Sequence, residues 1–138
     1  MIIASPKATF GLTEIRLGLW PFLIFRAVTA AVGERRTLEM VLTGRIFGPE
    51  EAKETGFIHE VAEDAVARAR AVATAVAEFS PTSIKSGMAF VQEVKERNWQ
   101  EAGEIARHVR NQVFETADFR EGIAAFREKR APKWPSLE

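Results

Sequence analysis

One carboxylate of this 138-residue chain lies among residues that can favour acid and base chemistry. Glu14 falls within Phe10-Gly11-Leu12-Thr13-Glu14-Ile15, and Gly18-Leu19-Trp20-Pro21 follows shortly after it. A carboxyl group surrounded by aliphatic and aromatic residues tends toward acid and base use, because an apolar setting disfavours the charged form. A glutamate near the start of an apolar segment also fits a helix cap or a surface position, and this stretch alone does not separate the two interpretations.

Further motifs follow Glu14 in a fixed order. They are Leu42-Thr43-Gly44-Arg45, then Ala52-Lys53-Glu54-Thr55-Gly56-Phe57-Ile58-His59-Glu60-Val61, and finally Phe119-Arg120-Glu121-Gly122 with Ala125-Phe126-Arg127-Glu128-Lys129-Arg130. Taken together, they make the chain from about Ile2 to Trp134 resemble the C-terminal half of the enoyl-CoA hydratase/isomerase family, the crotonase superfamily. The resemblance implies a mostly α chain with short β-strands. It would be the C-terminal portion of a crotonase-like α/β fold, a spiral of ββα units, with its helical trimerisation region.

The resemblance implies a role for each of several site residues. Glu14 matches the glutamate that family members place near the α-carbon of the acyl group, so it is the expected catalytic residue. The residues expected to contact the acyl group come shortly after it: Leu19, Trp20, Pro21 and Phe22. Hydratases typically have Pro-Gly-Ala-Gly-Gly where this chain has Pro21-Phe22-Leu23-Ile24-Phe25. This segment resembles other branches of the superfamily, including the methylglutaconyl-CoA type, at least as well. Its bulkier wall implies a differently shaped acyl pocket and leaves the identity of the acyl chain open.

Two residues near the end of the chain match positions that family members place beside coenzyme A. Phe126 corresponds to a position near the adenine and Lys129 to one near the phosphates, commonly those of coenzyme A bound to an adjacent subunit. A lysine suits that task as a point charge. A lysine in the last turn of a helix also favours the helix dipole without any ligand. No separate cofactor is implied, because the coenzyme A thioester is itself the substrate.

The sequence therefore predicts an enzyme that adds water to an enoyl-CoA through an enolate-like intermediate. Two alternatives stay open: isomerisation of an enoyl-CoA, which one glutamate can perform by moving a proton, and a non-catalytic helical assembly module. In the family, the backbone N–H groups that hold the thioester oxygen lie upstream of the matched region. We therefore expect the chain to be a truncated form or one piece of an enzyme, inactive by itself, that works as a homotrimer or hexamer or with a partner chain carrying the N-terminal half.

Composition excludes several other classes of function. Nineteen basic residues balance nineteen acidic ones, so nucleic acid is not an expected partner. The chain has no cysteine, and its histidines, His59 and His108, are far apart, which gives no basis for a metal site or a catalytic triad. The most apolar run, Leu17 to Phe25, is shorter than the about 20 residues that span a bilayer. We expect a cytoplasmic protein without a membrane anchor.

The pattern of the first 61 residues changes early from strand to helix. Residues 1–4 and 8–10 are predicted strands around a Ser5-Pro6-Lys7 turn. Pro21 is expected in the first turn of a helix that ends at Gly33, and residues 34–43 form the next helix, with Gly44 after it. Pro49 starts a short helix that Gly56 ends, and residues 57–61 form one more strand. Residues 1–61 are thus expected to be the tail of the spiral core.

Residues 62–138 are expected to form the C-terminal helical oligomerisation region. One predicted helix covers residues 63–79, with a narrow apolar face. Ser80 and Pro81 begin a long segment with an apolar stripe that bends or turns near Asn98 and Trp99. Asp118 and Glu121 have capping-box spacing, which predicts a last helix that runs to Arg130. Helices of this kind must bury their apolar stripes against a partner.

Overall fold

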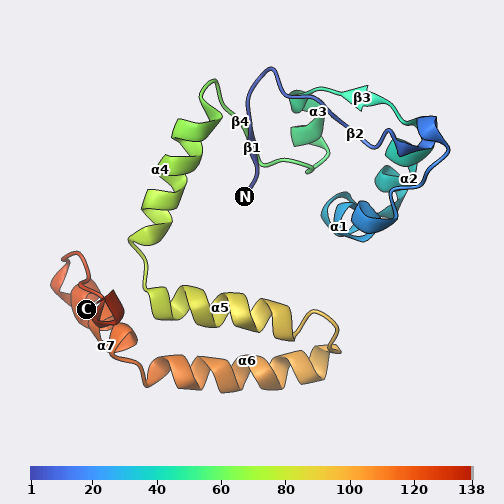
Figure 1. Cartoon of the computed structure of the whole chain (residues 1–138). Helices are drawn as coiled ribbons and strands as arrows, with labels where there is room; N and C mark the ends of the chain where they lie inside the picture. Colours follow the sequence, from blue (N-terminus) through green and yellow to red (C-terminus); the bar gives the residue numbers. More distant parts are fainter. Residues whose placement is uncertain (138) are drawn as a thin grey trace. The chain divides into compact units, whose positions relative to one another are not determined.

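The computed structural model describes residues 1–137 of the chain (Figure 1). The chain forms two compact units, of which the first covers Met1–Val72 and the second begins at Ala73. Helices dominate both units, and every strand is two residues long. The predicted class, mostly α with short β-strands, is confirmed.

The strands of the first unit form two small pairs. β1 (Ile3–Ala4) pairs in parallel with β4 (Glu60–Val61), and β2 (Phe10–Gly11) pairs in antiparallel orientation with β3 (Ile46–Phe47). The turn predicted between the first two strands is present, and the Ala8 N–H donates to the Ser5 carbonyl at 3.0 Å. The first and last predicted strands are confirmed in part, as residues 3–4 and 60–61, and the second is shifted to residues 10–11. The strand β3 was not predicted.

Glycine and proline set the helix boundaries of the first unit. A 3₁₀ helix, η1 (Glu14–Leu17), precedes α1 (Phe22–Val32), and Gly33 separates α1 from α2 (Glu34–Thr43). The predicted bounds of α2 are confirmed, as is the start of α3 (Pro49–Glu54) at its proline. Pro21 lies just before the first residue of α1 and not within its first turn. The buried core under these elements is apolar: Ala4, Leu12, Val28, Met40, Val41, Phe47, Ala52 and Ile58.

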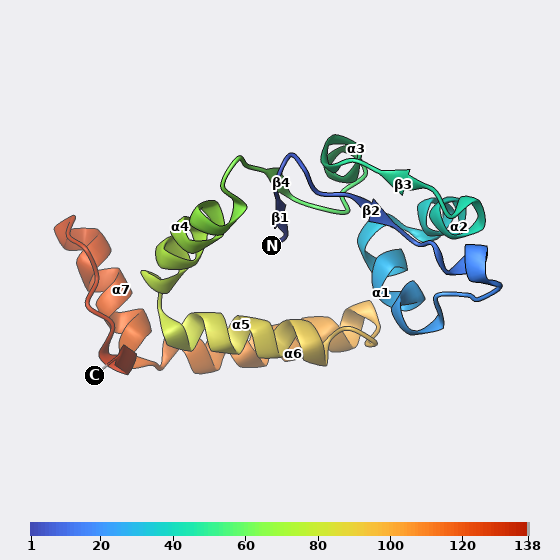
Figure 2. The same ribbon diagram turned by 45° about the horizontal axis from the view of Figure 1, so that its top comes forward.

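The helices that follow are α4 (Ala65–Ala77), α5 (Pro81–Glu93), α6 (Trp99–Phe114) and α7 (Ala117–Glu128), with a 3₁₀ turn, η2 (Pro135–Leu137), near the end. α4 crosses the boundary between the two units. The long segment expected from Ser80 onward is a hairpin, in which α5 and α6 lie side by side (Figures 1 and 2). Asn98 marks the turn because its side chain caps α6 by accepting from the Glu101 N–H at 3.0 Å.

The prediction that Asp118 caps the last helix was wrong. Thr116 is the N-cap of α7, and its hydroxyl accepts from the Phe119 N–H at 3.1 Å. The helix ends at Glu128, before the expected Arg130, because Arg130 turns back to form an ion pair with Glu121 at 2.5 Å. The capping-box spacing was real, but the threonine two residues earlier supplies the cap.

Asp118 instead joins three segments of the second unit. It is 2% exposed, and its Oδ2 atom accepts from the Ser80 hydroxyl at 2.5 Å and the Ser136 hydroxyl at 2.7 Å. Its Oδ1 atom accepts from the Ser136 N–H at 3.0 Å. Burial by itself would raise the pKa of this carboxyl group, but the hydrogen bonds from Ser136 and Ser80 outweigh burial and lower the pKa to about 2.

Most apolar side chains of the helices in this unit face solvent. Ala125 is the only buried hydrophobic residue described between residues 73 and 137. Phe79 is 61% exposed and Trp99 is 94% exposed, while Phe114 is partly covered by its stack on Phe119 at 4.6 Å. The polar cluster around Asp118 is therefore the main buried anchor of this unit.

We expect Asp118→Ala to lower the free energy of unfolding by about 2 to 3 kcal/mol, because the Ser136 N–H and two hydroxyl groups lose a buried acceptor. Asp64→Ala, which removes a single exposed hydrogen bond to Ala67 at 2.8 Å, is the matched control with a smaller loss. Urea denaturation followed by circular dichroism measures both. Equal losses in the two variants would contradict a central role for Asp118.

The same carboxyl group makes stability depend on pH. Its folded pKa of about 2 lies below the ordinary value of 3.8, so its contribution is complete above about pH 4 and is lost as the pH falls toward 2. The wild-type chain should therefore lose more stability than Asp118→Ala over that interval. Parallel slopes for the two proteins would show that Asp118 does not titrate as described.

Candidate active site around Glu14

Glu14 is the first residue of η1, and the fold fixes its backbone from both sides. Its carbonyl accepts from the Leu19 N–H at 3.0 Å, which closes the turn after η1. The Glu14 side chain, unlike its carbonyl group, has an oxygen without a partner: the Oε2 atom is buried and accepts no hydrogen bond from the described residues. A buried polar atom without a partner is costly, and in native proteins it often marks a place where a ligand or water completes the bonding.

Glu14 also lines a surface pocket of about 350 Å³. Besides Glu14, its lining residues are apolar: Trp20, Pro21, Phe22, Leu23 and Ile24. The volume falls within the range of small-molecule pockets, about 300 to 1,000 Å³. Three of the four residues predicted to contact the acyl group therefore share a pocket with Glu14. The fourth, Leu19, is 58% exposed and is not among the lining residues.

The start of α1 forms the wall of this pocket. Pro21 is buried and its carbonyl accepts from the Phe25 N–H at 2.9 Å, which begins the helix. The ring of Trp20 contacts the ring of Phe25 at 5.7 Å and so is held against the same helix. Phe22 and Leu23, in contrast, are 79% and 98% exposed. The bulky wall that the sequence predicts is thus present, with its outermost side chains open to solvent.

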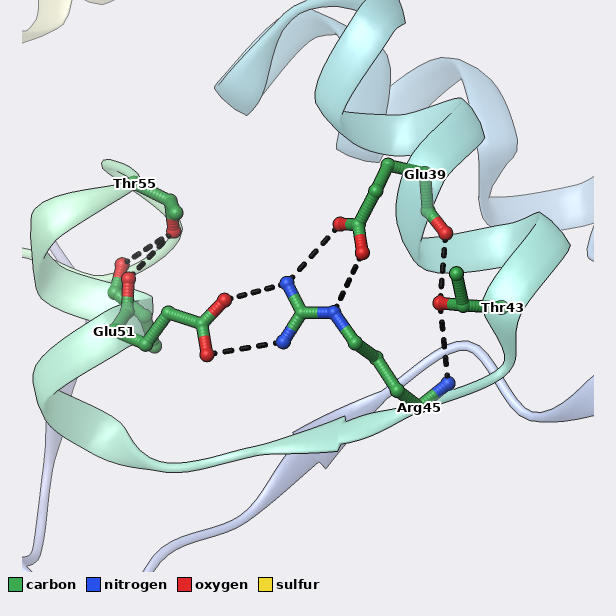
Figure 3. A network of polar contacts seen from close by, with 6 residues as sticks. Glu39, Thr43, Arg45, Glu51 and Thr55 are labelled. Atoms are coloured by element: carbon green, nitrogen blue, oxygen red, sulfur yellow. Dashed lines mark hydrogen bonds and ion pairs between the residues drawn. The ribbon is translucent and has the colours of Figure 1, made fainter.

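A polar network of the same unit lies at the turn between α2 and β3 (Figure 3). Arg45 donates to both carboxylate oxygens of Glu39, at 2.6 and 3.0 Å, and to both of Glu51, at 2.9 and 2.5 Å. The hydrogen bond from Arg45 lowers the pKa of Glu39. These side chains are between a third and a half exposed, so water screens the pair energies and the network mainly fixes geometry.

Phe126 and Lys129 belong to the second unit, where Phe126 lies in the last turn of α7 and Lys129 is the C-cap residue of that helix. Phe126 is 83% exposed, and its carbonyl accepts from the Lys129 N–H at 3.3 Å. Lys129 has a φ of 55° and is the only non-glycine residue of the described chain with a positive φ. A side chain in the left-handed region costs about 1 kcal/mol relative to glycine, the residue usual at this C-cap position.

The histidines differ in their surroundings. The His59 Nδ1 atom accepts from the Ile2 N–H at 3.0 Å, which ties the residue before β1 to the residue before β4. His108 is exposed on α6. Among residues 1–137, no group of three or more histidine, aspartate or glutamate side chains could hold a metal ion, and no helix there is long and apolar enough to cross a membrane.

Comparison with known proteins agrees with the arrangement of these elements. The family model described as enoyl-CoA hydratase/isomerase matches residues 1–136. The protein named "Probable enoyl-CoA hydratase echA8" of Mycobacterium bovis is 34% identical over 137 residues, which are 97% of this chain and 53% of that protein. The protein named "Probable enoyl-CoA hydratase, mitochondrial" of Dictyostelium discoideum is 33% identical over 137 residues, which are 97% of this chain and 50% of that protein.

Solved structures show the same relation. The crystal structure of an enoyl-CoA hydratase from Bacillus anthracis superposes with a TM-score of 0.90 and 27% identity, and covers 96% of this chain and 52% of that one. The enoyl-CoA hydratase/isomerase family protein from Hyphomonas neptunium superposes with a TM-score of 0.85 and 33% identity. The match covers 96% of this chain and 51% of that one. This chain belongs to the enoyl-CoA hydratase/isomerase family, with the C-terminal half of the crotonase fold. It spans about half the length of the curated relatives that it matches.

Proposed function

We propose that this chain supplies the α-carbon acid of an enzyme that adds water to an enoyl-CoA. The observation that carries the proposal is the Glu14 carboxyl group, whose Oε2 atom is buried and unpartnered at an apolar pocket. A carboxyl group with an oxygen that no protein group occupies, at the edge of an apolar pocket, is suited to exchange a proton with a bound substrate. The apolar lining suits the acyl chain of a thioester, and its bulk limits the shapes that fit.

In the proposed reaction, a water oxygen bonds to the β-carbon while a base removes one of the water protons. The electrons of the carbon–carbon double bond move toward the thioester carbonyl and form an enolate-like species. Glu14 then delivers its proton to the α-carbon. The base releases the proton that it took from water to solvent, and the Glu14 carboxylate takes one up from solvent, which restores both groups. Backbone N–H donors at the thioester oxygen are worth several kcal/mol, about 3 to 4 for one donor in other enzymes. By resemblance to the family, these donors lie in the upstream half, so we expect the isolated chain to be inactive.

Enoyl-CoA isomerisation is the alternative that one observation favours. Glu14 is the only acidic side chain that lines the pocket within the described residues. A single carboxyl group can take a proton from one carbon and return it to another, whereas hydration also needs a base for water. A carboxylate contributed by the complementary half of the enzyme would favour hydration, and its absence would favour isomerisation.

Coenzyme A binding by Phe126 and Lys129 is part of the same proposal. Lys129 keeps a long cationic side chain at a C-cap where glycine would relieve the backbone, which supports a role beyond the fold. Phe126, one turn earlier, is a large exposed ring of the kind that stacks on an adenine. The two residues offer an aromatic surface and a point charge at the C-terminal end of α7.

The exposed apolar residues of α4, α5 and α6 support association into a homotrimer or hexamer, or with a chain that carries the complementary half. Analytical ultracentrifugation at micromolar concentration should show oligomers. Met88→Lys, which places a charge on a side chain that is 61% exposed in α5, should shift the distribution toward smaller species. A monodisperse, compact wild-type monomer would argue against this interface. The same substitution at Leu42, 64% exposed on α2 in the first unit, is the control.

The direct test of the function is Glu14→Gln in the enzyme reconstituted with the complementary half. We expect kcat to fall by about 10² to 10⁴ with little change in acyl-CoA binding, because the amide cannot donate a carboxylic proton. Glu50→Gln, an exposed change at the start of α3, is the control and should keep kcat. Hydration is followed by the loss of the conjugated thioester absorbance. A kcat within a few-fold of wild type would refute the role of Glu14.

Two substitutions at Lys129 separate the cost in stability of its left-handed backbone from its contribution to ligand binding. Lys129→Gly should raise the free energy of unfolding by about 1 kcal/mol, because glycine adopts the left-handed conformation freely. Lys129→Ala keeps the backbone cost and removes the charge. We expect both variants to weaken coenzyme A binding about 5-fold in calorimetric titrations, since both lose one charge contact of about 1 kcal/mol. An unchanged affinity in both would leave Lys129 as a C-cap only.

A further inference from the structure

The segment Gly44–Phe47 lies against the residues on both sides of Glu14. Phe10 and Gly11 of β2 pair with Phe47 and Ile46 of β3. The strand pair ends three residues before Glu14, and η1 begins directly at Glu14. The turn from α2 into β3 therefore lies beside the residues that precede Glu14 in the chain and beside those that follow it.

Gly44 is the point of closest approach. A Cβ atom at Gly44 would lie 2.8 Å from Cγ2 of Ile15 and 3.4 Å from Cγ of Arg16, the two residues that follow Glu14. A second close contact lies at Gly11, where a Cβ atom would lie 2.8 Å from the carbonyl oxygen of Arg45. The 2.8 Å contacts are both shorter than real Cβ atoms show. The side chains of Ile15 and Arg16 in η1 therefore lie directly against the backbone of Gly44, and the β2 backbone at Gly11 lies directly against that of Arg45.

The backbone at Gly44 is itself anchored. The Thr43 hydroxyl donates to the Glu39 carbonyl at 2.8 Å and accepts from the Arg45 N–H at 3.4 Å. The Arg45 guanidinium spans Glu39 of α2 and Glu51 of α3, as Figure 3 shows. The residues on either side of Gly44 are thus tied to two helices, which leaves the turn little freedom to move away from Ile15.

We infer that Gly44 is a positioning residue for the Glu14 carboxyl group, and that the Arg45 network holds Gly44 in place for this task. The inference rests on the proposed function of Glu14 as the α-carbon acid. Any side chain at Gly44 pushes on Ile15 and turns η1, so that the Glu14 carboxyl group leaves the position from which it delivers a proton. Displacement of a catalytic group by about 1 Å can lower a rate about 10²-fold.

The chain contains a matched control for this contact. Gly44 and Gly56 both have left-handed backbones, with φ of 55° and 78°, but a Cβ atom at Gly56 would have no neighbour within 4 Å. Gly44→Ala and Gly56→Ala therefore carry the same kind of backbone strain, and only the first adds the clash with Ile15. In NMR spectra of the 138-residue chain with ¹³C-labelled glutamate, we expect the carboxyl and amide signals of Glu14 to shift in Gly44→Ala and to stay in Gly56→Ala.

A rescue experiment tests the contact itself. Ile15→Ala removes the Cγ2 atom that a Cβ at residue 44 would strike, so Gly44→Ala with Ile15→Ala should return the Glu14 signals to those of Ile15→Ala alone. The double variant also serves if Gly44→Ala does not fold. Unshifted Glu14 signals in Gly44→Ala, equal shifts in Gly56→Ala, or no rescue in the double variant would each overturn the inference.

Activity separates this inference from the proposed function. In the reconstituted enzyme, Gly44→Ala should lower kcat by roughly 10- to 100-fold with KM little changed, and Gly56→Ala should keep kcat within about two-fold. A full kcat in Gly44→Ala beside an impaired Glu14→Gln would refute the positioning role and keep the catalytic one. A full kcat in Glu14→Gln would refute the catalytic role, while the NMR shifts would still report on the contact.

Discussion

The antiparallel contact between β2 and β3 is the constraint on which the first unit depends. It brings Phe10 beside Phe47 at a ring distance of 5.9 Å, and Phe57 packs against both rings, at 5.5 and 5.9 Å. These aromatic contacts continue the buried core around Val41 and Met40. The same contact places the turn after α2 directly under η1. The pairing of β2 with β3 therefore sets both the packing of the core and the position of Glu14. A substitution that disturbs this pairing must affect both.

The two units bury their polar and apolar groups in opposite ways. The first unit has a continuous apolar core, whereas the second is anchored by the buried Asp118 cluster and leaves large apolar side chains open to solvent. Exposed residues such as Leu23 at the pocket and Trp99 on α6 are costly in water unless something covers them. The proposed assembly would cover these residues, complete the wall of the pocket, and supply the donors for the thioester oxygen.

Local sequence signals were sufficient to predict helix bounds and caps that depend only on neighbouring residues. The bounds of α2 followed from Gly33 and Gly44, and Ser80 caps α5 by accepting from the Ser83 N–H at 3.1 Å. These signals failed where a side chain is bound by residues that lie far away in the sequence. Asp118 has the spacing of a cap, but its acceptors are used by Ser80 and Ser136, which lie far from it in sequence.

The candidate site likewise combines local features that the sequence predicted with long-range contacts that it did not. Glu14 was identified because it matches a family motif, and the residues up to Phe22 because they follow it closely in sequence, although Phe22 departs from the usual hydratase pattern. Gly44 and Arg45 also belonged to a matched motif, yet nothing local indicates that Gly44 meets Ile15 or that Arg45 joins Glu39 to Glu51. Such contacts depend on the fold as a whole. The motif was the only sequence signal that pointed to them.

Exchange of the α-hydrogen of an acyl-CoA with solvent deuterium measures the step assigned to Glu14 without the rest of the reaction. Mass spectrometry of the saturated thioester, incubated with the reconstituted enzyme in D₂O, follows the exchange. We expect the wild-type enzyme to incorporate deuterium at the α-carbon and Glu14→Gln to lose that exchange by at least about 10²-fold. Exchange at the wild-type rate in Glu14→Gln would contradict the assignment, and would place the α-carbon acid on the complementary half of the enzyme.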